Sequence, residues 1–448
     1  MHKKTVGAVA PALLSGLLLS LALPAQAADE VSELKAMMKK MQERLDQLEK
    51  NQSGAVSDTA GATGKKTRYV EEGEIPGSFR MPGSDTSVKI YGHATMHATR
   101  DTLARTSYAN TGWGGSLFLQ PLNGTAAASR SGQTFMTARG SRFGLLTQTP
   151  TEALGPIMTK IEADFDGSQT SWGGETQSNL RLREAYVKVG NLLAGQTYST
   201  FTDLAAMPDL VEWNGTGIAP TIRQAMLRYS VPLGKSRVDL AVENSIGSSW
   251  PKAPVADFDT NFDYVARFDH NTDWGHVSVR GVGTQYHTDQ QHKWGFGAAA
   301  SSRVNLGPKD SLVALVAGGD GIGRFMYNAA VQGAVNTSQG MELWSGWGAH
   351  LGYTHKWSDQ LRSTVASAYT RFDENAKANT AARTVIAAGA GSDFYPNHSI
   401  RQFWANSFYT PYKNFDVGLD YTYGKRETFN GETGSISRLT SMVRYRFE

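Results

Sequence analysis

The chain has 448 residues, of which 47 are glycine and none is cysteine, and its 44 Lys and Arg nearly balance its 41 Asp and Glu. The near-neutral charge gives no reason to expect nucleic acid as a partner, and the lack of cysteine excludes disulfide scaffolds, thiolate zinc sites and thiol nucleophiles. A mean hydropathy of −0.37 argues against a polytopic helical membrane protein, but membrane β-barrels average to such a value.

Residues 1–27 have the three parts of a secretory signal peptide. Lys3 and Lys4 precede an apolar stretch that ends near Leu23, and Ala25-Gln26-Ala27 is a small-x-small cleavage site. We therefore expect the mature chain to begin at Ala28. An exported chain without disulfides is consistent with the bacterial envelope.

Residues 28–52 carry an a/d heptad seam with charged residues between the apolar positions. Its members are Val31, Leu34, Met38, Met41, Leu45 and Leu48. Because about three heptads are marginal alone, the seam predicts a coiled-coil oligomerisation segment of chains already held together. The alternative is an amphipathic helix that lies on its own protein. Residues 53–85 are small and polar, which predicts a flexible linker.

From residue 86 to residue 448 the hydrophobic period is two. The clearest examples are residues 415–424 and 439–447, each with one apolar and one polar face. Similar runs begin near Ser87, Thr137, Pro156, Leu180, Leu192, Ile222, Ser236, Asp263, Gly275, Lys293, Ser311, Leu343, Gln360 and Ile400. Together these runs predict sixteen strands.

The connections between these runs alternate between short polar turns and long loops. The short turns lie at 149–155, 190–191, 232–236, 271–273, 307–310, 357–359 and 411–414, and the link at 287–291 is the one short member of the other set. This alternation is typical of an outer-membrane barrel with periplasmic turns and external loops. We therefore predict an all-β fold, a sixteen-stranded antiparallel transmembrane β-barrel in contact with outer-membrane lipid.

If the apolar face meets lipid, the polar face lines a lumen. Its basic residues are Lys89, Arg142, Lys160, Arg228, Arg237, Arg267, Arg280, Lys293, Arg303, Lys356, Arg438, Arg444 and Arg446, and its acidic residues are Glu162, Asp164, Asp239, Glu243, Asp269, Asp416 and Asp420. The excess of basic residues predicts a lumen that concentrates small anionic solutes. The alternative is that these charges pair and leave little net field.

The link at 199–221 follows the fifth long run and is bent by glycine and proline. We expect it to fold inward as a constriction loop whose Asp203, Asp209 and Glu212 face Arg142 and Arg228. Such a transverse field would orient a solute that has a carboxylate at one or both ends, since guanidinium binds carboxylate bidentately.

Three segments resemble the DcaP-like trimeric outer-membrane porins. They are Leu180-Arg-Leu-Arg-Glu-Ala-Tyr-Val-Lys-Val-Gly190, Leu193-Ala-Gly-Gln-Thr-Tyr-Ser-Thr-Phe201 with Trp213-Asn-Gly215, and Ile222-Arg-Gln-Ala-Met-Leu-Arg-Tyr229. The resemblance covers essentially the whole mature chain. It implies a homotrimer of sixteen-stranded barrels that passes small anions, dicarboxylates among them, with its coiled coil in the periplasm.

Arg142 and Arg228 also look like two members of the basic cluster that general porins place opposite the constriction loop. Gln196 stands at the third position, and Arg181 or Arg183 would compensate. The predicted pore-lining residues are thus Arg142, Arg183, Gln196, Arg228, Arg267 and Arg280. The chain departs from the usual terminal aromatic by ending on Glu448.

We find no enzyme motif, and the sequence predicts no catalytic residue, cofactor or metal site. His93 and His97 are about 13 Å apart on a strand, too far to share an ion. Two other cargoes or roles stay open. One is a sugar-selective porin, which would guide sugars along aromatic side chains in the pore. Most aromatics here instead occupy the alternate strand positions expected to face lipid, with Tyr91 and Trp344 as exceptions. The other is a structural tether whose coiled coil approaches peptidoglycan.

Overall fold

The computed structural model describes residues 39–41, 43–44, 70–103, 121–126, 128–129, 131–167, 179–211, 222–245, 262–287, 291–326, 333–337, 339–385 and 396–447. The chain divides into two units, residues 1–69 and 70–448. In the first unit, residues 39–41 and 43–44 are helical and exposed. The predicted signal peptide, the rest of the coiled-coil segment and the linker to residue 69 lie outside the described residues.

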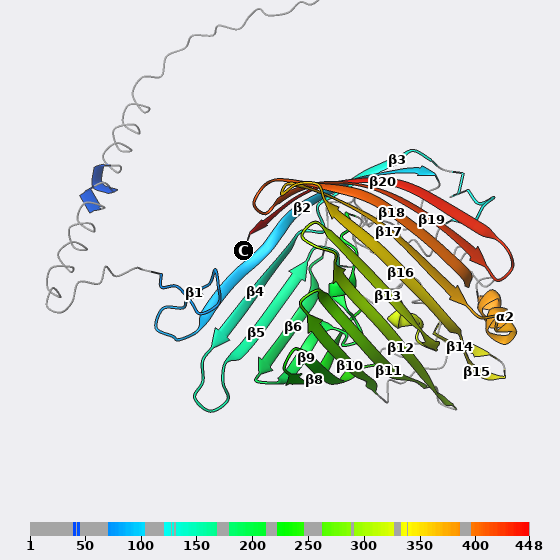
Figure 1. Ribbon diagram of the computed structural model, residues 1–448, viewed down its shortest axis with the longest axis horizontal. Helices are drawn as coiled ribbons and strands as arrows, with labels where there is room; N and C mark the ends of the chain where they lie inside the picture. The colour runs from blue at the N-terminus through cyan, green and yellow to red at the C-terminus, as the bar shows by residue number, and fades with distance from the viewer. Residues whose placement is uncertain are drawn as a thin grey trace, which may run out of the picture. The chain divides into compact units, whose positions relative to one another are not determined.

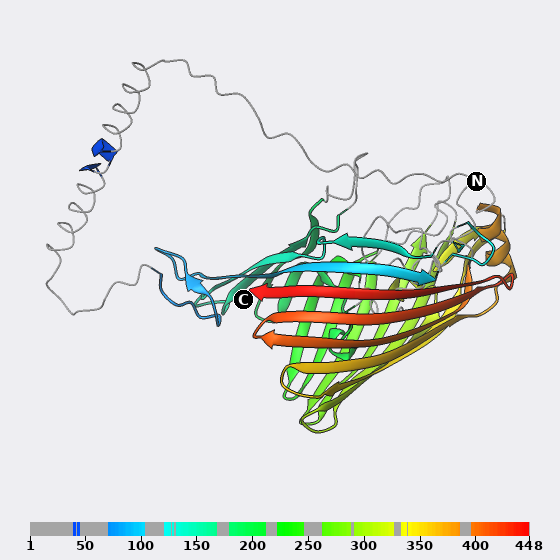
Figure 2. The ribbon, with the colours of Figure 1, turned by 90° about the horizontal axis from the view of Figure 1, so that it is seen from above.

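The second unit is built on one antiparallel sheet (Figures 1 and 2). Its main strands, in chain order, are β2 (Ser87–Leu103), β3 (Gln133–Thr137), β4 (Arg142–Thr149), β5 (Ile157–Asp164), β6 (Arg181–Val189), β7 (Leu192–Tyr198), β8 (Arg223–Leu233), β9 (Ser236–Asn244), β10 (Phe262–Thr272), β11 (Gly275–His287), β12 (His292–Asn305), β13 (Asp310–Asp320), β16 (Ser345–Lys356), β17 (Leu361–Phe372), β18 (Asn397–Tyr412), β19 (Phe415–Thr428) and β20 (Thr433–Phe447).

The sheet closes on itself as a barrel of sixteen strands. β20 pairs with β2 from Gly92↔Phe447 onward, so the last strand meets the first. β3 and β4 pair with successive parts of β2 and form one strand that is interrupted at residues 138–141. The predicted closed sixteen-stranded antiparallel barrel is therefore confirmed. Glu448 lies outside the described residues.

The linker predicted over 53–85 ends earlier than expected. β1 (Phe79–Arg80) pairs with β2 through Arg80↔Ser87, and Glu72 bridges to Phe79. The backbone N–H of Glu74 also donates to Ser87 Oγ. Residues 70–85 are thus fixed to the start of the barrel, because their backbone groups find partners there although their side chains are small and polar.

Apolar and polar residues alternate along the strands, and the apolar ones form the outer face of the barrel. In β19, Val417, Leu419 and Tyr421 are exposed, whereas Asp416 and Asp420 are buried on the inner side. The same two-residue period holds in the other long strands, and their cross-strand registers keep each face continuous. No described helix is long and apolar enough to span a membrane.

One sector of the inner face differs from the polar face that the sequence predicted. β9 to β13 point buried apolar side chains inward: Ala241, Val265, Val282, Ala299, Leu315 and Ala317. They pack against Ile322, Phe325 and Met326 around a short 3-10 helix (Gly323–Phe325), against β14 (Ala334–Thr337) and against α2 (Ala376–Val385). β15 (Gly340–Leu343) pairs with β14. Loop segments cover this sector, because burial of its apolar side chains away from water stabilises the folded barrel.

Gly195 in β7 tests the packing of the wall. Its φ is 133°, and a Cβ there would lie 2.3 Å from the backbone oxygen of Ala185. We expect Gly195→Ala to cost about 1–3 kcal/mol, since the backbone conformation and the contact are both unfavourable. The measurement is the temperature at which the folded band is lost in heat-modifiability gels.

Gly281→Ala is the matched control. A Cβ at Gly281 would meet only the Gly297 oxygen, at 3.9 Å, so folding should be little changed. Equal thermal stability of the two variants would contradict the assigned backbone of β7.

Candidate permeation pathway

The loop that follows β7 enters the barrel and lies along its inner wall. Residues 199–211 bond first to β9, then to β10–β12 and β16, and finally to β17 and β18. His276 and Arg362 lie in the half of their strands next to the short turns, whereas Glu243 lies at the other end of β9. Residues 212–221, including the predicted Glu212, lie outside the described residues.

Asp203 is the main anchor of this loop. Its carboxylate accepts hydrogen bonds from His276 Nε2 at 3.2 Å and from Ser301 Oγ at 2.5 Å, and it lies 3.2 Å from Arg267 and 3.4 Å from Arg280. Burial alone would raise the pKa of this carboxyl, but these hydrogen bonds and charges outweigh burial and hold the pKa below its usual range. Asp203 also caps the 3-10 helix Leu204–Ala206.

The carbonyl oxygens of the loop are bound by side chains of the wall. Arg303 donates to the Ala205 and Met207 oxygens at 2.6 and 3.2 Å, and His350 Nε2 donates to the Ala206 oxygen at 2.9 Å. Because a carbonyl only accepts, the proton of His350 is on Nε2. These bonds satisfy backbone groups that would otherwise be buried without partners.

The end of the described loop packs closely against two glycines of the barrel wall. Gly352 and Gly418 have no side chain where Pro208 and Val211 lie, and a Cβ at Gly418 would come within 2.6 Å of Val211. Val211 joins Phe408 in one apolar cluster, and Leu210 packs on another that contains Trp404. The loop therefore covers the inward aromatics of β18.

The expected transverse field between the loop acids and Arg142 and Arg228 is wrong for the two acids that the structure describes. Asp203 is buried against Arg267 and Arg280, and Asp209 lies 2.6 Å from Arg362 on β17. Both carboxylates point to the wall beside the loop because arginines there neutralise them. The described loop thus brings little unpaired negative charge to the lumen.

The wall opposite this contact holds a network of ion pairs. Glu162 on β5 lies 3.3 Å from Arg142, 2.8 Å from Arg183 and 3.8 Å from Lys160, and Asp164 lies 2.7 Å from Arg183. None of the bonds of residues 199–211 reaches β2 or β4–β6 in the part of the chain that is described. Residues 199–211 therefore leave this wall uncovered.

In most ion pairs of the lumen, the carboxylate is more deeply buried than the cation that it pairs with, an order that we call layering. Glu162 is 4% exposed and its partner Arg142 is 19% exposed, while Asp416 is 2% exposed and its partner Arg446 is 32% exposed. The same order holds for Lys160 and Glu184, for Arg181 and Asp164, and for Arg237 and Asp269. Asp209, at 40%, is more exposed than Arg362 and is an exception. In most pairs the cation lies on the accessible side.

The six residues predicted to line the pore have different positions. Arg142 and Arg228 lie half-buried on the inner face, and Arg267 is reduced to 12% exposure by Asp203 and Asp269. The side chains of Arg183 and Arg280 are fully buried in their ion pairs and hold structure instead of lining the lumen. These two placements correct the prediction, because burial among carboxylates removes their guanidiniums from the aqueous passage.

Gln196 is also placed differently from the prediction. It pairs with Ala225, which is exposed on the outer face, and its amide donates to the Leu182 oxygen at 3.2 Å. The neighbouring Leu193 and Thr197 are the inward residues of β7. Gln196 therefore belongs to the outer face. The prediction was shifted by one residue along β7, which moves a side chain to the opposite face of the sheet.

Three arginines near the short-turn ends of β17 and β20 were not singled out as site residues. Arg444 and Arg446 lie 2.9 and 2.6 Å from Asp416, and Arg362 lies 3.9 Å from it. Arg444 and Arg446 were visible in the sequence as inward members of an alternating strand. Arg362 gave a weaker signal, because the strand around it is less regularly amphipathic.

Residues 20–447 match the model of the DcaP outer membrane protein family. The chain belongs to this family. It is accordingly a protein of the bacterial outer membrane with a porin fold. No curated protein is similar enough in sequence to count as a relative.

Solved structures share the DcaP fold at low identity. The outer membrane channel DcaP of Acinetobacter baumannii has a TM-score of 0.71 and 23% identity, over 84% of this chain and 100% of that one. OmpT of Vibrio cholerae has a TM-score of 0.51 and 9% identity, over 82% and 100%. The anion-selective porin from Comamonas acidovorans has a TM-score of 0.50 and 12% identity, over 81% and 100%.

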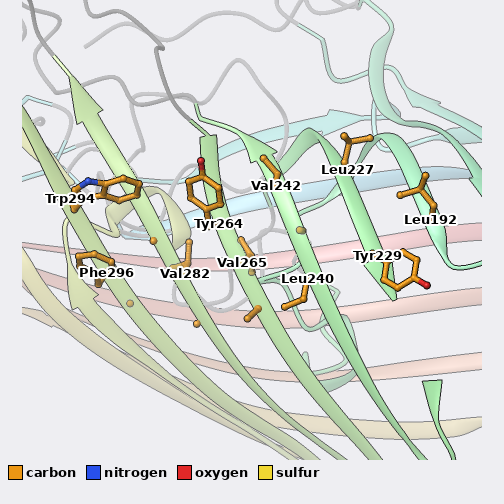
Figure 3. Close-up of a pocket in the computed structure, with 15 residues that line it drawn as sticks. Leu192, Leu227, Tyr229, Leu240, Val242, Tyr264, Val265, Val282, Trp294 and Phe296 are labelled. Carbon is orange, nitrogen blue, oxygen red and sulfur yellow. The ribbon is translucent and has the colours of Figure 1, made fainter. Parts of the chain in front are cut away.

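A hollow of about 760 Å³ lies on the outer face of this DcaP family barrel (Figure 3). Leu227, Tyr229, Leu240 and Tyr264, which line it, are exposed members of the outward parity of β8–β10. Its floor includes Gly281 on β11. The hollow is thus part of the apolar outer surface and not of the lumen.

Asp203→Asn should release the constriction loop of this DcaP family member. The substitution leaves Arg280 buried without its counter-charge, and breaking a buried pair in this way costs about 3–5 kcal/mol. We expect a higher single-channel conductance with more open-channel noise in planar bilayers. Asp209→Asn is the control and should change conductance less, because Asp209 is the more exposed of the two carboxylates. An unchanged conductance in Asp203→Asn would refute the anchoring role.

Proposed function

We propose that this protein is a trimeric outer-membrane channel for the diffusion of small anionic solutes, with dicarboxylates as the preferred class. The observation that carries the proposal is the layering of the lumenal ion pairs. A solute that moves along β2 and β4–β6 meets the ammonium and guanidinium groups of Lys160, Arg142 and Arg181, behind which lie buried Glu162 and Asp164.

The greater exposure of the cations argues against the alternative that the paired lumenal charges leave little net field. Pairing is extensive, but the long Arg and Lys side chains extend past the short carboxylates. Arg228 has no carboxylate within ion-pair distance among the described residues. In a low-dielectric channel, a row of accessible cations raises the local concentration of anions and their rate of entry.

Two groups of arginine, one on each side of β2, favour a solute with two carboxylates. One group is on β4–β6, around Glu162, and the other is on β17 and β20, around Asp416. Each guanidinium keeps its charge at any relevant pH and can hold a carboxylate through two parallel hydrogen bonds. Because only β2 lies between β4 and β20, one small molecule can reach both groups.

The sugar-channel alternative receives less support. Trp404 and Phe408 on β18 point inward but are buried under Leu210 and Val211, and Trp344 is buried beside Asn379. Tyr91 is half-buried and donates to Glu162 at 3.0 Å. In the described part of the barrel these rings do not form the accessible aromatic track on which a sugar would stack.

The assembly is part of the same proposal. The heptad seam of residues 28–52 would join three chains on the periplasmic side and bring them near peptidoglycan. One OmpT structure among the solved neighbours is described as a trimer form.

Anion selectivity should depend on Arg142 and Arg228. In planar bilayers the wild type should show an anion-shifted reversal potential in a potassium chloride gradient, with current blocked by a small dicarboxylate and not by an oligosaccharide. Arg142→Gln with Arg228→Gln should lower the anion-to-cation permeability ratio by about threefold or more, since two charges that face the passage are removed.

Lys235→Gln is the control for a lost positive charge. Lys235 is 65% exposed in a short turn and pairs with Asp273 outside the strands, so its loss should leave selectivity unchanged. A cation-shifted reversal potential in the wild type would overturn the proposal. A block by the oligosaccharide and not by the dicarboxylate would favour the sugar channel.

A further inference from the structure

His93 lies between two arginines on the inner face of the barrel. The register pairs His93 on β2 with Arg142 on β4 and with Arg446 on β20. Directly paired residues have Cα atoms about 4.5–5.5 Å apart, so the three side chains start from one short row. Arg444 lies one inward position further along β20, opposite Thr95.

The break between β3 and β4 fixes the tautomer of this histidine. His93 Nε2 lies 3.0 Å from the Gly140 oxygen, and Ser141, which follows, is bonded to the backbone of Thr95. Because a carbonyl oxygen only accepts, Nε2 carries the proton. Nδ1 of the neutral ring therefore holds a lone pair, and it has no hydrogen-bond partner among the described residues.

The charged groups around His93 are cationic. Arg142 faces it from β4, and Arg444 and Arg446 face it from β20. The acids on the next strands out, Glu162 and Asp164 on β5 and Asp416 on β19, are already held by arginines. No described carboxylate forms an ion pair with His93. On β2 itself, the inward neighbours are Tyr91, Thr95 and His97.

The arginines of the row keep binding capacity. Arg446 is 32% exposed and uses one Nη2 bond to Asp416 among its described contacts, although a guanidinium has five N–H donors. Arg444 Nε is buried without a hydrogen-bond partner among the described residues. An anion in front of the row would therefore find donors of Arg446 on the β20 side of the imidazole and the guanidinium charge of Arg142 on the β4 side.

We propose that Arg142, His93 and Arg446 form a proton-coupled site for a carboxylate or another small oxyanion. An anion held between the two guanidiniums supplies the negative charge that a protonated imidazole needs among arginines, and the protonated Nδ1 becomes a further donor to that anion. The anion and the proton then bind together, and each increases the affinity for the other. This site rests on the proposed function and adds a pH dependence to it.

The test uses the full-length wild type in planar bilayers and ethane-1,2-disulfonate as the blocking anion. This probe keeps its two charges between pH 5.5 and 7.5, so a change in block belongs to the protein. An ordinary histidine changes charge in this range, and a bound anion would favour the charged form of His93 among its arginines. We expect the apparent Kd of block to fall by about threefold or more from pH 7.5 to pH 5.5, as one added charge near the site predicts.

His93→Gln should keep the anion-selective current and lose this pH dependence, and His93→Asn provides a second variant if the first does not give a folded barrel. His97→Gln is the matched control, since His97 is inward on the same strand but pairs with Met442 and Thr137. It should keep the pH dependence.

Block that is independent of pH in the wild type would overturn the site, as would an unchanged pH dependence in His93→Gln. Either result would leave anion selectivity itself standing. A cation-shifted reversal potential in the wild type at pH 7.5 would instead overturn the proposed function together with the site.

Discussion

The accessible charge of this barrel depends on a difference in side-chain length. Asp and Glu on the inner face end close to the wall, whereas Arg and Lys extend beyond them and keep their charged ends near water. Several buried carboxylates are stabilised by two or three cations, as Glu162 is by Arg142, Lys160 and Arg183. A chain that is nearly neutral overall thereby presents mostly cations on the accessible side of its lumenal ion pairs.

The same ion pairing determines where the passage runs. Asp203 holds residues 199–211 against β10–β12, and apolar loop segments cover Val265, Val282 and Leu315 on the neighbouring sector of the wall. The sector with Arg142 and Lys160 is not covered by residues 199–211. Burial of apolar side chains and neutralisation of loop acids thus act together, since both remove wall area from the lumen.

Much of the fold was predictable because a barrel wall obeys one simple rule. The two-residue period identifies the strands and their inner faces, and the inward parity assigned to Lys89, Arg237 and Arg446 agrees with the observed registers. The alternating loop lengths identify the closed antiparallel topology. These signals are local and repeat in every strand, so single errors do not accumulate.

The site was less predictable because it depends on local irregularities. Opposite the Glu162/Ala163 step the register shifts, so that Arg183 and Glu184 are both buried, which no strict alternation predicts. Gln196 follows Gly195, whose φ of 133° departs from a regular strand. Arg280 is buried only because a loop distant in sequence carries Asp203 to it. Contacts of this kind are decided by tertiary packing and leave no periodic signal.

The most direct test of the account measures the local electrostatic potential at an uncharged residue on the wall that carries Arg142 and Lys160. The chain has no cysteine, so Tyr186→Cys, on the inner face opposite Lys160, introduces a single thiol. If cations lie in front of the buried acids, an anionic methanethiosulfonate reagent should modify this thiol faster than a cationic one, relative to their rates with a free thiol. Ala299→Cys, in the apolar core, should react with neither. Faster modification of Tyr186→Cys by the cationic reagent would contradict the account.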